Sequence, residues 1–191
     1  MKRRELIKHI ALLTGAAVAG SEFFLSSCKN NDQVTVGFFT EKDISFFDEV
    51  AETILPKTNT PGAKDAEVGK FMALYSTDCY SNNELQLLKE GITDLNKKSS
   101  EMNREFFVYA TAAQKQKVLE EADAEAKKYN EEKEHSKKKV MAPHYFTLMK
   151  QMILLGFFTS KPGASEVLRY IPVPGKYQGC IDYKKGETSW A

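Results

Sequence analysis

LGFFTSKPGASEVLRYIPVPGKYQGC (residues 155–180) is the stretch that decides how this chain folds. An apolar segment ends at Thr159, a short amphipathic piece follows Gly163, and prolines and glycines then favour an extended chain. The stretch contains many aromatic and aliphatic side chains, yet it is too rich in proline to form a single helix. These side chains must therefore pack on another surface, which is either the core of this protein or a partner.

Upstream of this stretch, apolar residues recur with the spacing of amphipathic helices. The periodicity predicts helices over residues 43–55, 67–79, 84–98, 112–134 and 143–159. No alternating pattern is long enough for a strand to compete. The sequence therefore predicts an all-α fold: a compact helical domain of about five to six helices, followed by an extended C-terminal tail rich in proline and glycine.

Local signals place the ends of these helices. Pro56 ends the first helix, and a polar joint at residues 99–100 ends the third. Thr111 and Gln114 have the spacing of a capping box before the fourth. The last long helix, which Pro143 opens, is apolar nearly all round and is therefore predicted to be central.

Length and charge limit the classes of protein that the chain can represent. The 191 residues fit one domain, and 42 % of them are hydrophobic, which is enough for a core. The net charge of +1, from 27 basic and 26 acidic residues, gives no electrostatic footprint for nucleic acid, so we expect no nucleic-acid partner. The charged run 115–139 is open to two interpretations, an interaction tail or a solvated helix face, and its alternating signs favour the second.

The N-terminus has the features of an export signal. A basic start with Arg3 and Arg4 precedes the apolar run 10–20, which is too short for a spanning helix of about 20 residues. Residues 3–8, RRELIK, resemble the bacterial twin-arginine signal, which exports proteins that are already folded. The alternative is an ordinary secretory signal that begins with two arginines.

A possible lipid attachment site follows the apolar run. Leu25-Ser26-Ser27-Cys28 resembles a lipobox, in which a peptidase cuts before a cysteine that carries the lipid. The competing possibility is cleavage at the A-x-A sequence of residues 17–19. With lipidation at Cys28, we expect three parts: a signal peptide over residues 1–27, a tether over residues 28–40, and a single helical domain over residues 41–191.

The two remaining cysteines form an even pair. In an oxidising compartment, Cys79 and Cys180 could join in a disulfide that pins the C-terminal stretch to a helix near the middle of the chain. The alternative is two unpaired thiols. We expect the disulfide.

Catalytic motifs are missing from the sequence. It has no Cys-x-x-Cys-His for haem, no Gly-x-Gly-x-x-Gly for a dinucleotide and no phosphate loop. His9, His135 and His144 are too scattered to form a metal cluster, and His144 beside Pro143 is more typical of a helix start than of a ligand. We therefore expect no catalytic, cofactor-binding or metal-binding residue in this chain.

Three blocks together resemble a known family. They are Glu49-Val50-Ala51-Glu52-Thr53-Ile54-Leu55-Pro56, Thr58-Asn59-Thr60-Pro61-Gly62-Ala63-Lys64-Asp65-Ala66, and Gly156-Phe157-Phe158-Thr159-Ser160 with Tyr170-Ile171-Pro172-Val173-Pro174-Gly175. Their order and spacing are similar to those of the gluconate 2-dehydrogenase subunit 3 (gamma subunit) family. One departure is Glu67, where the family commonly has glycine, and it puts the geometry of one turn in doubt.

The resemblance implies an accessory role rather than an enzyme. Such subunits accompany a large flavoprotein of the glucose-methanol-choline type, which holds FAD, oxidises a sugar or sugar acid and passes electrons to a cytochrome c. The small subunit stabilises its partner and carries it through the twin-arginine route. On this interpretation the protein is exported to the periplasm and anchored to a membrane by lipid at Cys28.

The resemblance and the C-terminal stretch together suggest where the partner binds. Tyr170 and Tyr177 are candidate aromatic anchors, and Pro172 and Pro174 reduce the entropy lost on docking. The competing interpretation is that these residues cover the protein's own core. A different class of function, a stand-alone periplasmic lipoprotein that binds a small ligand between its helices, remains the alternative.

Overall fold

The computed structural model describes residues 35–135, 142–173, 175–176, 179–182 and 184–190. The fold below is that of the described residues from Thr35 onward. The export motif at Arg3 and Arg4 and the lipidation site at Cys28 lie outside the described residues. So do two residues of the expected partner interface, Pro174 and Tyr177.

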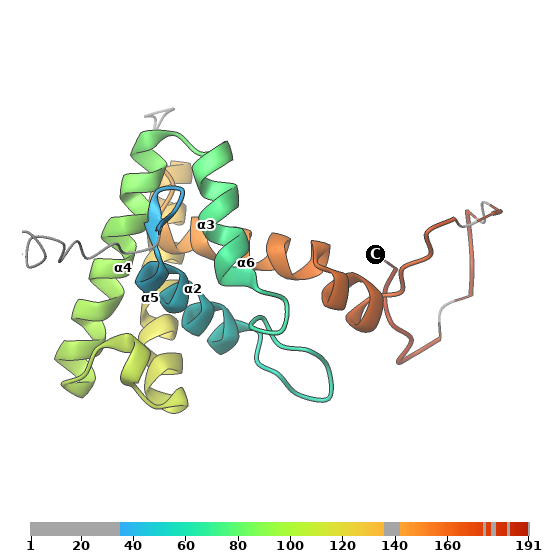
Figure 1. Cartoon of the computed structure of the whole chain (residues 1–191), viewed down its shortest axis with the longest axis horizontal. Coiled ribbons are helices and arrows are strands. Elements are labelled where there is room, and N and C mark those ends of the chain that lie inside the picture. The colour runs from blue at the N-terminus through green and yellow to red at the C-terminus, as the bar shows by residue number, and fades with distance from the viewer. Residues whose placement is uncertain (1–34, 136–141, 174, 177–178, 183, 191) are drawn as a thin grey trace, which may run out of the picture. The chain divides into compact units, whose positions relative to one another are not determined.

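The described chain is mostly helical, which confirms the predicted fold class (Figure 1). A two-stranded antiparallel hairpin, β1 and β2, precedes the helices, and two short helical turns, η1 and η2, complete the fold. The elements are β1 (Thr35–Val36), β2 (Phe39–Thr40), α2 (Glu41–Ile54), α3 (Val68–Cys79), α4 (Asn82–Asn103), η1 (Phe107–Tyr109), α5 (Ala112–His135), α6 (Tyr145–Thr159) and η2 (Gly163–Val167).

Helix α6 is the central element, as its sequence predicts. It packs against α3, α4 and α5, and its residues Met149, Met152 and Ile153 are at most 1 % exposed. These side chains join Phe47 of α2 and Leu88 of α4 in one core cluster. Burial of such aliphatic and aromatic surface is the main term that stabilises the fold. Among the described residues, no helix is long and apolar enough to cross a membrane.

Side-chain caps set several helix ends where the sequence places them. At the start of α5, the N–H of Thr111 donates to Oε1 of Gln114 over 2.9 Å, as the predicted capping box requires. Ser81 and Glu84 form a full capping box at the start of α4. His144 caps α6, because its Nδ1 accepts from the N–H of Phe146 over 3.2 Å. The expectation that His144 starts a helix is therefore confirmed.

The predicted break at residues 99–100 is wrong, since α4 runs on to Asn103. Ser99 is fully buried and follows Leu95 by one turn on the inner face, so a small polar residue continues the apolar stripe. The helix ends instead at Arg104, whose φ of 60° is left-handed. A polar pair is thus a weak break signal when one of its members is small enough to be buried.

Residues 35–40, which the sequence assigns to the tether, form the hairpin. Phe39 is fully buried and stacks edge-on against Phe47 of α2, with ring centroids 5.2 Å apart. The N–H of Phe38 donates to Oγ1 of Thr77 near the end of α3 over 3.1 Å. The two strands have only two residues each, so no alternating pattern could reveal them.

Candidate functional site

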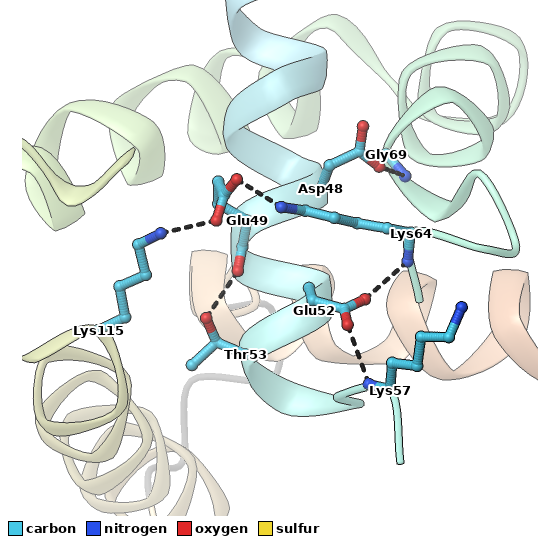
Figure 2. A network of polar contacts seen from close by, with 8 residues as sticks. All are labelled: Asp48, Glu49, Glu52, Thr53, Lys57, Lys64, Gly69 and Lys115. Atoms are coloured by element: carbon cyan, nitrogen blue, oxygen red, sulfur yellow. Dashed lines mark hydrogen bonds and ion pairs between the residues drawn. The ribbon is translucent and has the colours of Figure 1, made fainter. Parts of the chain in front are cut away.

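The most distinctive polar site lies where α2 meets the loop that leads to α3. One face of α2 carries Asp48, Glu49 and Glu52, and all three carboxylates accept hydrogen bonds from residues outside the helix (Figure 2). Spacings of three and four residues place acidic side chains on one side of a helix. This acidic face holds the loop through both backbone and side-chain groups.

Glu52 fixes the loop by its backbone. Its two carboxylate oxygens accept from the N–H of Lys57 and from the N–H of Lys64, each over 2.9 Å. Figure 2 shows both bonds, one from Lys57 and one from Lys64 to the carboxylate of Glu52. A Cβ added to Gly62 would stand 2.6 Å from an oxygen of Glu52, so only glycine permits this close approach. One acidic side chain therefore satisfies the backbone at both ends of the loop.

Asp65 closes the same loop from inside. Its carboxylate accepts from the N–H of Gly62 over 3.0 Å and from Nζ of Lys57 over 3.1 Å. The bond from Gly62 is the first cause, and the bond from Lys57 the second, that lowers the pKa of Asp65. The loop is thus a folded unit with defined contacts.

Glu49 joins the loop to a third helix. Nζ of Lys64 lies 2.5 Å from one oxygen of Glu49, and Nζ of Lys115, from α5, lies 2.6 Å from the other (Figure 2). Partial burial alone would raise the pKa of Glu49, but the bonds from Lys115 and Lys64 outweigh it and lower the pKa. The carboxylate is therefore held ionised between two lysines, which is a structural arrangement and not that of a general acid.

Asp48 is the carboxylate with the opposite shift. Burial raises its pKa, although the N–H of Gly69 donates to it over 2.9 Å. That bond anchors the first turn of α3, next to Glu67. Glu67 itself has φ of 50° and ψ of 39°, the left-handed conformation that side chains disfavour. Glutamate thus occupies a turn whose backbone geometry suits glycine.

A shallow cleft of about 510 Å³ brings the loop beside the C-terminal stretch. One wall is formed by residues 57–61 with Asp65, and the other by Lys161, Pro162 and Glu166, which belong to the turn into η2 and to η2 itself. Two sequence blocks about a hundred residues apart thus meet in space. The cleft is open to solvent, and polar side chains and two prolines line it, which suits a contact surface better than a reaction site.

The C-terminal stretch begins with a fixed element. η2 is a single π-helical turn, in place of the short amphipathic helix that the sequence predicts after Gly163. A Cβ on Gly163 would stand 1.9 Å from the carbonyl oxygen of Phe157, so the turn packs directly on the end of α6. The extended character of the tail beyond it stays a prediction.

The predicted interface residues in the described part of this tail are exposed. Tyr170 is 58 % exposed and Pro172 is exposed as well. They therefore do not cover the protein's own core. The core-cover interpretation of these two residues is set aside.

The predicted disulfide does not form in the structure. Cys79, the last residue of α3, and Cys180, in the tail, are both exposed free thiols. An even number of cysteines shows that a pair is possible, but a disulfide also needs Cα atoms about 4.4–6.8 Å apart, which sequence spacing cannot supply. The disulfide between the tail and α3 therefore stays a prediction.

The sequence did not identify the loop anchors individually. Glu49 and Glu52 lie in the first block that carries the resemblance, and their spacing of three residues is a readable signal for one helix face. Lys115 could not be found, since it is 66 residues away from Glu49. In the described residues no group of three or more His, Cys, Asp or Glu side chains is placed to hold a metal ion.

The chain was also compared with known protein families, curated proteins and solved structures. The family model described as gluconate 2-dehydrogenase subunit 3 matches residues 41–175. The chain belongs to this family. Curated proteins and solved structures gave no match. The span matched to the subunit family contains the loop, its acidic anchors and both walls of the cleft, which places the site inside the family's shared region.

Proposed function

We propose that this chain is the non-catalytic small subunit of a periplasmic FAD-dependent dehydrogenase, and that it stabilises and co-exports the large flavoprotein subunit. The family match over residues 41–175 carries the proposal. The large subunit is of the glucose-methanol-choline type, holds the FAD, oxidises a sugar or sugar acid such as gluconate, and passes electrons to a cytochrome c. This chain contributes binding surface and an export signal.

Exposed apolar side chains support a partner surface around the C-terminal stretch. Leu155 and Phe158 on the outer face of α6 are 41 % and 38 % exposed, and Ile171 and Val173 are 45 % and 80 % exposed. Large apolar residues that stay exposed to solvent are typical of protein interaction sites when they gather in one patch. Tyr170, Pro172, Pro174 and Tyr177 form the proposed contact with the large subunit.

The export half of the proposal rests on the N-terminal sequence. Arg3 and Arg4 direct the folded pair through the twin-arginine route, and lipid at Cys28 then anchors it to a membrane from the periplasmic side. A large subunit without a signal of its own would depend on this chain for export. That dependence is the point to test.

The decisive experiment replaces Arg3 and Arg4 together by lysine and measures the dehydrogenase in periplasmic fractions. We expect both subunits to stay in the cytoplasm, because the twin-arginine route requires the arginine pair. Lys2→Arg, which leaves the pair intact, is the matched control. Full periplasmic dehydrogenase in the double variant would refute the carrier role.

Co-purification from detergent extracts tests the partner directly. We expect a yellow flavoprotein, larger than this chain, to remain bound through affinity purification. A colourless chain that purifies alone would instead support the stand-alone lipoprotein that binds a small ligand.

A further inference from the structure

Arg169 joins the two ends of the C-terminal segment. Its N–H donates to the carbonyl oxygen of Ser189 over 2.8 Å, and it pairs with Trp190 in an isolated parallel bridge. Its guanidinium carbon lies 4.7 Å from the centroid of the Trp190 ring, a cation–π contact. Its Nη2 also lies 3.6 Å from a carboxylate oxygen of Glu187. One residue thus contacts three others that follow it by about twenty positions.

These contacts hold Arg169 beside Glu187, Ser189 and Trp190, so the segment between them begins and ends at one fixed base. Arg169 comes two residues after η2, whose last turn is held by the N–H of Leu168 donating to the carbonyl oxygen of Gly163 over 3.0 Å. η2 in turn packs on the end of α6. Closing a loop removes conformational entropy from the chain before any partner binds.

The closed loop presents apolar side chains on a basic background. Tyr170, Ile171, Val173 and Ile181 are 45–80 % exposed. Lys176, Lys184 and Lys185 are exposed, and none of them pairs with an acidic side chain among the described residues. The loop's acidic residues are Asp182 and Glu187, and Glu187 contacts Arg169. The unpaired charge of the loop is therefore positive.

We propose that Arg169 is a clasp that preforms a docking loop, made of the described residues 170–173, 175–176, 179–182 and 184–188, and that this loop binds an acidic protein surface around an apolar centre. The proposal rests on the proposed function in one respect, that this surface belongs to the large flavoprotein subunit. The lysines complement acidic groups at the rim, and the apolar side chains fill the centre, as in protein interfaces generally. Arg169 acts as a positioning residue: it shapes the loop that makes the contact.

The clasp can be tested without any partner, because Trp190 is the only tryptophan of the chain. In the purified full-length chain, we expect Arg169→Ala to shift the Trp190 emission to longer wavelength and to raise its quenching by acrylamide. Tryptic cleavage after Lys184 and Lys185 should become faster. Arg169→Lys, which keeps charge but loses the planar stacking group, should show an intermediate shift.

The matched control is Lys176→Ala, which removes an exposed cation of the loop outside the clasp. It should leave the Trp190 spectrum unchanged. Emission, quenching and cleavage that are the same in Arg169→Ala as in the wild type would overturn the clasp.

Binding of the co-purified flavoprotein subunit tests the docking role. We expect Arg169→Ala to weaken binding by about tenfold, because an open loop must be ordered on association. Reversing Lys184 and Lys185 to glutamate should weaken it as well, and more strongly at low salt. Lys128→Glu, on the exposed side of α5, is the charge-reversal control and should bind like the wild type.

The possible outcomes separate the two proposals. If the wild type binds the flavoprotein and the loop variants bind it equally well, the loop is not the docking site, but the proposed function stands. If the wild type binds no flavoprotein, the docking role fails together with the proposed function. The emission and quenching of Trp190 then still decide whether Arg169 holds the loop closed. Sedimentation with phosphatidylglycerol vesicles tests whether the loop binds lipid instead of protein. If the loop variants lose binding to the vesicles but not to the flavoprotein, the loop binds lipid and the docking proposal is overturned.

Discussion

Single residues carry strain that substitution can relieve, and Glu67 is the clearest case. Its left-handed backbone, with φ of 50°, costs a residue with a Cβ about 1 kcal/mol relative to glycine. Glu67→Gly should therefore stabilise the fold by up to about 1 kcal/mol, reduced by the greater freedom of glycine in the unfolded chain. Denaturant unfolding measures the change.

Two further variants separate backbone strain from charge at this position. Glu67→Asn should also stabilise, since asparagine tolerates the left-handed region. Glu67→Ala removes the same charge beside Asp48 but keeps the strain, and should gain little. If alanine stabilised as much as glycine, relief of charge repulsion with Asp48 would be the cause and not backbone geometry.

His144 gives the fold a pH dependence near neutrality. Burial lowers its pKa, a change that the nearby Lys98 supports and Glu125 and Asp94 oppose. The cap at α6 also needs an unprotonated Nδ1 to accept from Phe146. Because the folded pKa lies below the usual value of about 6.5, this stability is present above that pH and is lost as the pH falls towards the folded pKa.

The measurement is the free energy of unfolding between pH 8 and pH 5. We expect the wild type to lose about 1 kcal/mol, the typical worth of a cap. His144→Asn, which can still cap but does not titrate, should not show this loss. An equal loss in this variant would assign the pH dependence to other groups.

At the scale of elements, Glu52 is the side chain that bonds the backbone at both ends of the loop between α2 and α3. Glu52→Gln keeps the shape of Glu52 but replaces one acceptor oxygen by an amide donor, so the N–H of Lys57 or Lys64 loses its partner. We expect a loss of about 1 kcal/mol, because water can reach these exposed bonds. Tryptic cleavage within the loop should also become faster. Glu101→Gln, at an exposed ion pair of 3.9 Å, should change neither property.

The helices were predictable from sequence because their signals are local. Periodicity, the Thr111–Gln114 cap and the apolar stripe of α6 depend on residues within a few turns of each other. The extension of α4 was missed because Ser99 is polar in sequence but buried in the fold. The spacing of Glu49 and Glu52 in the sequence is enough to place them on one face of α2. The bond from Lys115 to Glu49 spans 66 residues and depends on how the helices pack, so the sequence could not reveal it. The predicted disulfide depends on packing in the same way, because an even number of cysteines says nothing about the distance between them, and it stays a prediction.

Across the whole molecule, ion pairs at partly exposed positions join helices that are distant in sequence. Asp43 pairs with Lys89 and links α2 to α4, while Lys150 of α6 pairs with Asp123 of α5. Asp94 accepts from the hydroxyl of Tyr145 over 2.6 Å and links α4 to α6. Together with Glu49 and its two lysines, these contacts lie between the helices that enclose the core.

The carboxylates of these links share one direction of pKa shift. Partial burial tends to raise the pKa of Asp43, Glu49 and Asp94, but bonds from lysine, threonine or tyrosine outweigh it and lower the pKa. For Asp123, bonds from lysines are the main cause of the lowered pKa. Carboxylates that are more acidic in the folded state stabilise it above their unfolded pKa, near 4, and this stability is lost as the pH falls further.

We therefore expect a second acid-induced loss of stability below about pH 4, separate from the loss caused by His144. Its total is of the order of 2 kcal/mol, because each pair is partly exposed and contributes at most about 1 kcal/mol. Asp48, whose pKa is raised, acts in the opposite direction and reduces the total. Denaturant unfolding from pH 5 to pH 3 measures the loss. Glu49→Gln should reduce it, Glu101→Gln should not, and a free energy of unfolding that stays constant over this range would contradict the role of these links.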